Sequence, residues 1–232
     1  MRSIAKLMKD WQFTGPNGVT TAVELPHTWN AKDGQDGGND YWRGCCTYCT
    51  RFAAPVYDPA QQQVWLQFEG VNASAAVLLN GQQLCTHDGG YSTFRAEVTE
   101  LLQAENQLTV RVDNSVNDRV YPQKADFTFY GGIYRDVSLL VVNKNHIALG
   151  HFGDTGVKIT PTLKEGSADI QVETLVEGEG TVAVELLDAE GRTVAKGEGK
   201  NTSLHLDAPH LWNGIKDPYL YTCVVRLLQD GQ

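Results

Sequence analysis

The carboxyl group of Asp126 lies beside an unusual cluster of aromatic residues. Phe127, Phe129 and Tyr130 follow it directly, and the glycine pair Gly131-Gly132 comes next. A carboxylate accepts hydrogen bonds from sugar hydroxyls, and an aromatic ring covers the C–H face of a sugar. The segment therefore predicts carbohydrate contact through Asp126. A structural alternative stays open, in which this carboxylate caps a turn beneath a small aromatic core.

A buried strand is expected just after this loop. Val137 to Val142 is an apolar run rich in β-branched residues, with polar residues on both sides. Gly131 and Gly132 allow backbone angles and close approaches that other residues resist. The segment thus predicts a loop of special backbone geometry that leads into a strand.

Short alternating segments predict an all-β protein. The chain has 23 glycines and 8 prolines, and 41% of its residues are hydrophobic. Leu108, Val110 and Val112 alternate with polar residues, as in a strand buried on one face. Asn80-Gly81 after an apolar run is a strong hairpin signal. Two antiparallel sheets packed face to face are the expected arrangement.

The character of the chain changes after residue 143. A polar connector over residues 145–156 precedes a second set of short alternating segments, which begins at Val157. Such a set, ending in a long apolar segment over residues 220–228, is typical of an immunoglobulin-like sandwich. We expect one domain over residues 1–143 and another over residues 144–232.

The loop around Asp126 resembles the end of the N-terminal sugar-binding domain of glycoside hydrolase family 2, the β-galactosidase and β-glucuronidase family. In that family an Asp is followed six positions later by Gly-Ile-aromatic-Arg, here Gly132 to Arg135. Five other segments resemble the family's patterns, in the family's order: Leu25 to Trp29 (LPH-x-W), Tyr41 to Phe52 (Y-x-R-G…Y…F), Phe68 to Gly81 (F-x-G-V-x…V-x-x-N-G), His87 to Phe94 (H-x-G-G-Y-x-x-F) and Pro209 to Tyr221 (P-x-L-W…P-Y-L-Y). These six segments extend over nearly the whole chain.

The resemblance implies a galactose-binding-like jelly-roll sandwich followed by an immunoglobulin-like β-sandwich whose last strand is truncated. It also implies a retaining β-glycosidase. The two catalytic glutamates of such an enzyme lie on a (β/α)8 barrel that this chain lacks, so no catalytic residue is expected here. Asp126 is then a substrate ligand inserted into the barrel's pocket. His87 and Asp88 are candidates to line the same pocket.

Charge and composition exclude several classes of partner. The net charge of −9 and a pI near 5.1 argue against nucleic-acid binding, because phosphate recognition needs a basic face. No segment is long and apolar enough to span a membrane, and Met1 to Asp10 lacks the apolar core of a signal peptide. A cytoplasmic location is therefore expected.

Two segments have residues that bind metals in other proteins. Asp33 to Asp40 is rich in oxygen ligands but lacks the spacing of an EF-hand, so a polar loop is favoured over a cation site. Cys46 and Cys49 stand in a CxxC pattern, but a strand there would place them on opposite faces. We expect reduced thiols, no metal and no cofactor in this chain. A cation in the full-length enzyme stays open.

The remaining aromatic and basic residues favour structural roles. Trp212 is expected to pack inside the immunoglobulin-like domain, and Trp42 either in the core or against a sugar. Arg43 and Arg135 are expected to bond carboxylates or backbone carbonyls.

Three functions remain open after these observations. The favoured one is the non-catalytic N-terminal part of a β-glycosidase, acting on terminal β-glycosides and preferably β-galactosides. Its partner would be a carbohydrate substrate bound through the missing barrel, and the full-length enzyme would be a homo-oligomer. The alternatives are a free-standing carbohydrate-binding module with an immunoglobulin-like spacer, and an adhesive pair of sandwiches.

Overall fold

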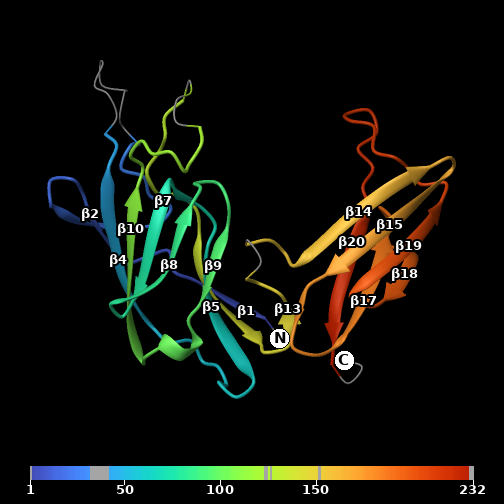
Figure 1. Ribbon diagram of the computed structural model, residues 1–232, viewed down its shortest axis with the longest axis horizontal. Coiled ribbons are helices and arrows are strands. Elements are labelled where there is room, and N and C mark those ends of the chain that lie inside the picture. Colours follow the sequence, from blue (N-terminus) through green and yellow to red (C-terminus); the bar gives the residue numbers. More distant parts are fainter. Residues whose placement is uncertain (1, 32–41, 123–124, 126, 151–152, 230–232) are drawn as a thin grey trace. The chain divides into compact units, whose positions relative to one another are not determined.

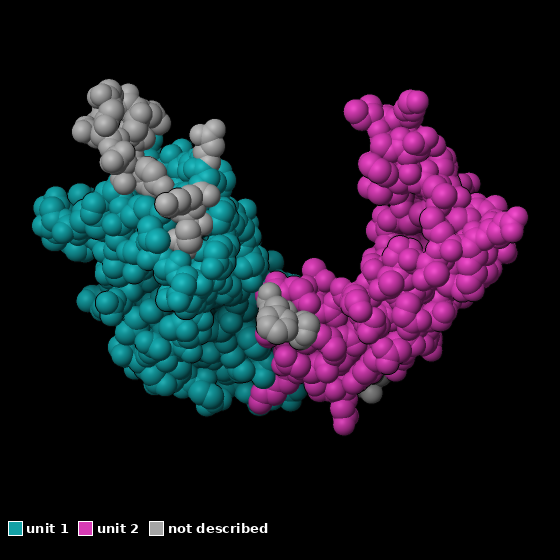
Figure 2. Space-filling model, turned by 45° about the horizontal axis from the view of Figure 1, so that its top comes forward, with its two compact units in different colours: residues 1–143 teal, residues 144–232 magenta. Residues whose placement is uncertain are grey.

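The computed structural model describes residues 2–31, 42–122, 125, 127–150 and 153–229. It divides into two compact units, which we call unit 1 (Met1–Asn143) and unit 2 (Lys144–Gln232), coloured separately in Figure 2. Each unit has its own hydrophobic core. Among the residues described, strands form all the regular structure except one 3-10 turn, η1 (Thr99–Leu101) (Figure 1). The predicted all-β fold is confirmed.

Unit 1 is a sandwich of two antiparallel sheets (Figure 1). The four-stranded sheet has the order β1 (Ser3–Lys6), β12 (Val137–Asn143), β5 (Gln62–Phe68), β9 (Phe94–Glu97). The six-stranded sheet has the order β3 (Thr20–Val23), β2 (Trp11–Thr14), β4 (Cys45–Ala53), β10 (Glu105–Asp113), β7 (Ser74–Leu79), β8 (Gln82–Asp88). A short pair of β6 (Val71–Asn72) and β11 (Gly132–Ile133) lies at the end of the loop that carries the aromatic residues.

Local sequence explains these strands. Leu108, Val110 and Val112 of β10 are fully buried and alternate with exposed or half-buried neighbours, as predicted. Asn80 and Gly81 have positive φ angles of 52° and 83° and join β7 to β8 in the expected hairpin. Both faces of β12 are buried, which agrees with its continuous apolar sequence. The core between the sheets is built around Trp11, Tyr48 and Phe68.

Unit 2 contains two three-stranded sheets. One has the order β14 (Val157–Lys164), β15 (Ser167–Thr174), β19 (Asn201–Asp207), and the other β18 (Thr193–Glu198), β17 (Thr181–Leu187), β20 (Thr222–Leu228). A two-stranded pair of β13 (His146–Ile147) and β16 (Val176–Glu177) completes it. Ile170, Val172 and Val184 lie at the centre of its core.

The position of Trp212 differs from the prediction. Its side chain is 64% exposed, on the loop between β19 and β20, so it does not pack inside unit 2 as expected. Strand β14 is an edge strand, and its apolar residues Ile159 and Leu163 are also exposed. Among the described strands, none extends the β18-β17-β20 sheet beyond its edge strand β20. The sandwich is therefore open on this side, where β14 is the edge strand of the other sheet.

The cysteines lie as the strand pattern predicts. Cys46 is buried and Cys49 is half-buried, on opposite faces of β4, and all five cysteines are free. Burial raises the pKa of the Cys46 thiol to about 12, which favours the inert protonated form. Within the described ranges, no helix is long and apolar enough to cross a membrane.

Candidate functional site

Three buried asparagine side chains hold the aromatic loop of unit 1, and we call them the amide clamp. Asn114 Nδ2 donates to the Phe129 carbonyl over 2.9 Å, and Asn72 Nδ2 donates to the Tyr130 carbonyl over 2.7 Å. Asn30 Oδ1 accepts the N–H of Gly131 over 2.7 Å. Consecutive peptide units are thus bonded by side chains that come from three separate segments of the chain.

Two members of the amide clamp, Asn30 and Asn114, are bonded to each other. Asn114 Nδ2 also donates to Asn30 Oδ1 over 3.2 Å, and Asn114 Oδ1 accepts the N–H of Gly44 over 2.8 Å. Asn30 Nδ2 donates to the Trp42 carbonyl over 2.8 Å. A buried amide without partners costs about 1–3 kcal/mol. Because Asn30 and Asn114 are bonded at both ends of their amide groups, their burial fixes the loop instead of destabilising the fold.

The glycine pair permits this close packing. A Cβ at Gly131 would overlap the ring of Trp29, and a Cβ at Gly132 would overlap the carbonyl oxygen of His27. Gly132 also has φ +138°, which disfavours any residue with a Cβ. Thr28 Oγ1 donates to the Gly131 carbonyl over 2.8 Å from the same side. A larger residue would therefore require the Trp29 ring to move at position 131 and the His27 backbone to move at position 132.

Two arginines support the site through backbone carbonyls, as predicted. Arg43 Nε donates to the Asn114 carbonyl over 2.7 Å, and its guanidinium lies 4.9 Å from the centre of the Phe129 ring. Arg135 donates to the carbonyls of Glu69 over 3.3 Å and Tyr91 over 3.1 Å. These contacts connect the loop to the segments around residues 43, 69 and 91.

A small cavity opens beside the aromatic loop. Its volume is about 140 Å³, and six residues line it: Thr28, Asn72, Tyr91, Thr128, Tyr130 and Tyr134. Tyr91 is 54% exposed and Tyr130 is 45% exposed, so these two rings stand at its mouth. The lining combines ring faces with hydroxyl and amide groups, which is the chemistry that a sugar requires.

The structure describes only two of the three predicted substrate ligands, His87 and Asp88. Asp126 lies outside the described residues, although its neighbours Phe127 to Gly131 form the loop just described. His87 and Asp88 end β8 and do not line the cavity, whereas Tyr91 of the same segment does. The predicted roles of all three as substrate ligands remain predictions. The Asp33 to Asp40 segment also falls outside the described residues.

His87 and Asp88 both have partners within the fold. The His87 ring stacks on Phe94 at 4.2 Å between centroids, and its Nε2 lies 3.0 Å from the Gly89 carbonyl. Burial lowers the pKa of His87 below its ordinary value. Asp88 accepts hydrogen bonds from Arg119 Nε over 2.9 Å and from Ser74 Oγ over 2.5 Å, and these bonds lower its pKa.

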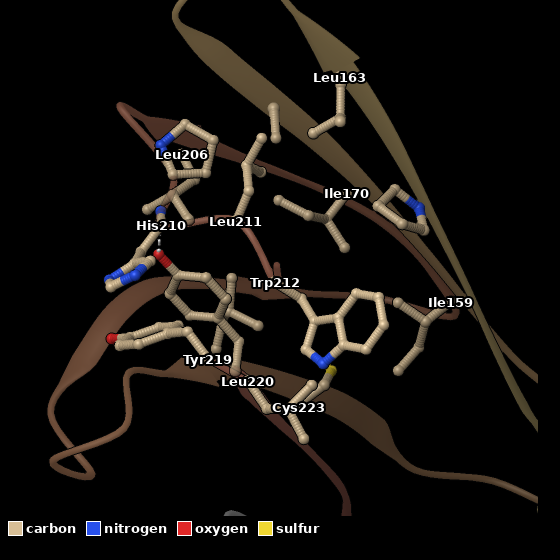
Figure 3. Close-up of a pocket in the computed structure, with 15 residues that line it drawn as sticks. Ile159, Leu163, Ile170, Leu206, His210, Leu211, Trp212, Tyr219, Leu220 and Cys223 are labelled. Carbon is tan, nitrogen blue, oxygen red and sulfur yellow. Dashed lines mark hydrogen bonds between the residues drawn. The ribbon is translucent and has the colours of Figure 1, made fainter. Parts of the chain in front are cut away.

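Unit 2 contains a larger groove of different character. Its volume is about 420 Å³, and Figure 3 shows Ile159, Ile170, Leu211 and Trp212 gathered around it. The hydroxyls of the lining residues Tyr219 and Tyr221 already accept the backbone N–H groups of Ala189 and His210. The groove is therefore mostly apolar and offers little to orient a sugar.

The amide clamp has no signature in the local sequence. Asn30 and Asn114 bond each other across 84 positions of the chain, and no local pattern marks such a pair. Their positions in the sequence could have indicated two of these asparagines, because Asn30 directly follows the LPH-x-W segment and Asn72 ends the F-x-G-V-x segment. Segments that resemble the family patterns in fact meet at this loop, which links them in space.

Comparisons with known proteins agree with this arrangement. Residues 38–162 match the family profile described as "Glycosyl hydrolase 2 galactose-binding domain-like", and residues 151–232 match "Glycosyl hydrolases family 2". A β-glucuronidase of Bacteroides fragilis is 32% identical over 97% of this chain, and a β-galactosidase of Thermoanaerobacter pseudethanolicus is 29% identical over 74%. The crystal structure of an FMN-binding β-glucuronidase from Faecalibacterium prausnitzii L2-6 superposes on 100% of this chain with a TM-score of 0.92 and 35% identity.

The matched region is a minor part of each relative. The chain spans 35% of the Bacteroides enzyme, 24% of the Thermoanaerobacter enzyme and 38% of the Faecalibacterium chain. It corresponds to their N-terminal, non-catalytic region. The six sequence segments, both sandwich domains and these matches lead to one conclusion: the chain belongs to glycoside hydrolase family 2.

Proposed function

We propose that this chain is the non-catalytic N-terminal part of a retaining β-glycosidase that hydrolyses terminal β-glycosides. The observation that carries the proposal is the aromatic loop after Asp126, which Thr28 and the three asparagines of the amide clamp hold by hydrogen bonds. Positioned side chains speed hydrolysis by orienting the substrate, even when the reacting groups lie elsewhere. In this proposal the loop presents Asp126 to a sugar held in a separate catalytic domain.

The sugar is best assigned as a β-glucuronide, with a β-galactoside second. The sequence alone favoured β-galactosides, but relatives named β-glucuronidase outnumber those named β-galactosidase. A cytoplasmic location and a homo-oligomeric full-length enzyme are part of the same proposal. A free-standing carbohydrate-binding module remains the alternative function, since unit 1 has a sugar-compatible cavity of its own.

Assays of the full-length gene product and of this 232-residue chain test the proposal. We expect the full-length protein to hydrolyse nitrophenyl β-glucuronide faster than nitrophenyl β-galactoside, and this chain alone to hydrolyse neither. A faster reaction with the galactoside would reverse the order of substrates. An inactive full-length protein, together with micromolar sugar binding by this chain, would establish the binding module instead.

Asp126→Asn tests the role of the loop in the full-length enzyme. The substitution keeps the shape but loses a charge-assisted hydrogen bond worth roughly 1.5–3 kcal/mol, so kcat/KM should fall about 10- to 150-fold. The melting temperature should stay nearly unchanged. A variant that melts several degrees lower but keeps full activity would support the turn-capping alternative.

A further inference from the structure

We propose that the cavity between Tyr91 and Tyr130 binds one pyranose ring of a glycoside. This inference rests on the proposed function and adds to it a second contact, distinct from the carboxylate of Asp126. It makes Tyr91 and Tyr130 sugar-binding residues that contact a ring of the substrate.

The size of the cavity suits a single ring. Its volume of about 140 Å³ compares with the ~150 Å³ cavities that accept one benzene molecule in other proteins. Water-sized ligands would leave most of it unfilled, and a disaccharide would extend beyond its mouth. One six-membered ring is the ligand that matches.

The walls are aromatic, and the rings of Tyr91 and Tyr134 contact each other. The Tyr91 and Tyr134 rings meet edge to face, with centroids 6.5 Å apart. The Tyr134 hydroxyl donates to the Gly90 carbonyl, and Arg135 packs 5.3 Å from the centre of the Tyr134 ring. Asn72 holds Tyr130 by its carbonyl, which leaves the ring of Tyr130 at the surface. A bound ring would thus meet a preorganised face at Tyr91 and Tyr134, and would order the exposed ring of Tyr130.

The polar lining favours a sugar over a purely apolar ring. Thr28, Thr128 and the 5%-exposed Asn72 contribute hydroxyl and amide groups beneath the aromatic mouth. Thr28 Oγ1 and Asn72 Nδ2 already donate to the Gly131 and Tyr130 carbonyls, so the Thr128 hydroxyl and Asn72 Oδ1 are the groups of the described lining that a ligand would use. A pyranose offers hydroxyls to them at its edge and C–H groups to the tyrosines on its face.

NMR titration of this chain with methyl β-glucuronide and methyl β-galactoside tests the inference. We expect binding in the millimolar range, with shifts at Tyr91, Thr128 and Tyr130. Tyr91→Ala and Tyr130→Ala should each weaken binding by about 2- to 12-fold, the range typical of one aromatic contact. Tyr130→Phe keeps the ring and should retain binding.

Tyr121→Ala is the matched control. Tyr121 is also in unit 1 and is 75% exposed, but it does not line the cavity, so its loss should leave the affinity unchanged. Equal weakening by Tyr121→Ala and Tyr130→Ala would overturn the inference. Phenol binding as tight as that of either glycoside would do so too, because it would show an apolar slot.

The hydrolysis assays separate this inference from the proposed function. An active full-length enzyme, with glycoside binding that Tyr91→Ala and Tyr130→Ala leave unchanged, would refute the cavity alone. An inactive full-length protein whose cavity binds as expected would refute the proposed function alone.

Discussion

Unit 1 and unit 2 are both β-sandwiches, but they cover their apolar residues to different extents. The largest fully buried side chains, including Trp11, Tyr48 and Phe68, all belong to unit 1. Among the described residues of unit 2, no Phe, Tyr or Trp side chain is buried, and Trp212 is exposed beside an apolar groove. Four and six strands form the sheets of unit 1, against three in each main sheet of unit 2.

Having an apolar face and having that face covered are two different properties of a strand, and hydropathy alone does not distinguish them. Alternation shows which face of a strand is apolar, as it does for both β10 and β15. Whether another sheet covers that face depends on how many strands lie opposite. In unit 1, a core covered on both sides supports the aromatic loop that follows Asp126. In unit 2, Ile159 and Leu163 remain exposed on the open side of the sandwich. The following experiments test this comparison.

The largest contrast is expected between two tryptophans. Trp11 is fully buried, so Trp11→Ala should lower the free energy of unfolding of unit 1 by about 3–5 kcal/mol. Trp212→Ala should change the stability of unit 2 by roughly 0.5 kcal/mol or less, because the side chain is already exposed. Urea denaturation monitored by amide hydrogen exchange would measure the free energy of unfolding of each unit separately. Similar losses from both variants would contradict the comparison.

Two glycines provide the next contrast. Gly132→Ala combines a φ of +138° with a contact to the His27 carbonyl, and should destabilise unit 1 by about 2–4 kcal/mol. Gly191 in unit 2 has φ +78°, but no atom lies within 4 Å of the place that a Cβ would occupy, so Gly191→Ala should cost only about 1 kcal/mol. Thermal unfolding of the two variants measures the difference. An equal loss of stability in the two variants would mean that the His27 carbonyl leaves room for a Cβ at position 132.

The amide clamp should contribute less, but measurably. Asn114→Ala removes bonds to Gly44, Asn30 and Phe129, so it should destabilise unit 1 by about 1–3 kcal/mol. It should also accelerate hydrogen exchange in the loop that follows Asp126. Asn201→Ala, at an exposed strand position of unit 2, is the control and should change stability by about 0.5 kcal/mol at most. Unchanged exchange in the loop would show that the clamp does not fix it.

The smallest effects concern two histidines with opposite pKa shifts. Burial lowers the pKa of His87 in unit 1, while hydrogen bonds to Asp169 and Asp207 raise the pKa of His205 in unit 2. His87 therefore contributes fully to the free energy of unfolding above its unfolded pKa near 6.5. This contribution is lost as the pH falls through the lower pKa of the folded state. The contribution of His205 is complete below 6.5 and is lost as the pH rises through its higher folded value.

NMR titration of both imidazoles measures these shifts directly. Mild acidification should weaken unit 1 through His87 while it maintains the contribution of His205 to unit 2. Asp169→Asn should move the pKa of His205 back toward 6.5 and leave His87 unaffected. Identical titration midpoints for the two histidines would contradict the assignment.

The fold class, the hairpin at Asn80-Gly81 and the family could all be predicted from the sequence. Strand alternation and turn residues act over a few positions, so they can be read without knowing the rest of the fold. Six ordered segments were enough to indicate family 2 because each preserves local spacing. For Arg43 and Arg135 the residue type left carboxylates and backbone carbonyls open as partners, and the structure shows bonds to carbonyls.

The three-dimensional arrangement of the chain determines which residues meet at the candidate site. Asn30 and Gly131 are bonded across 101 positions, and Tyr91 and Tyr130 share a cavity although they lie on separate loops. It also decided that Trp212 is exposed. Such contacts depend on the order and register of strands in both sheets. That information is distributed over the whole chain, so no short segment of the sequence contains it.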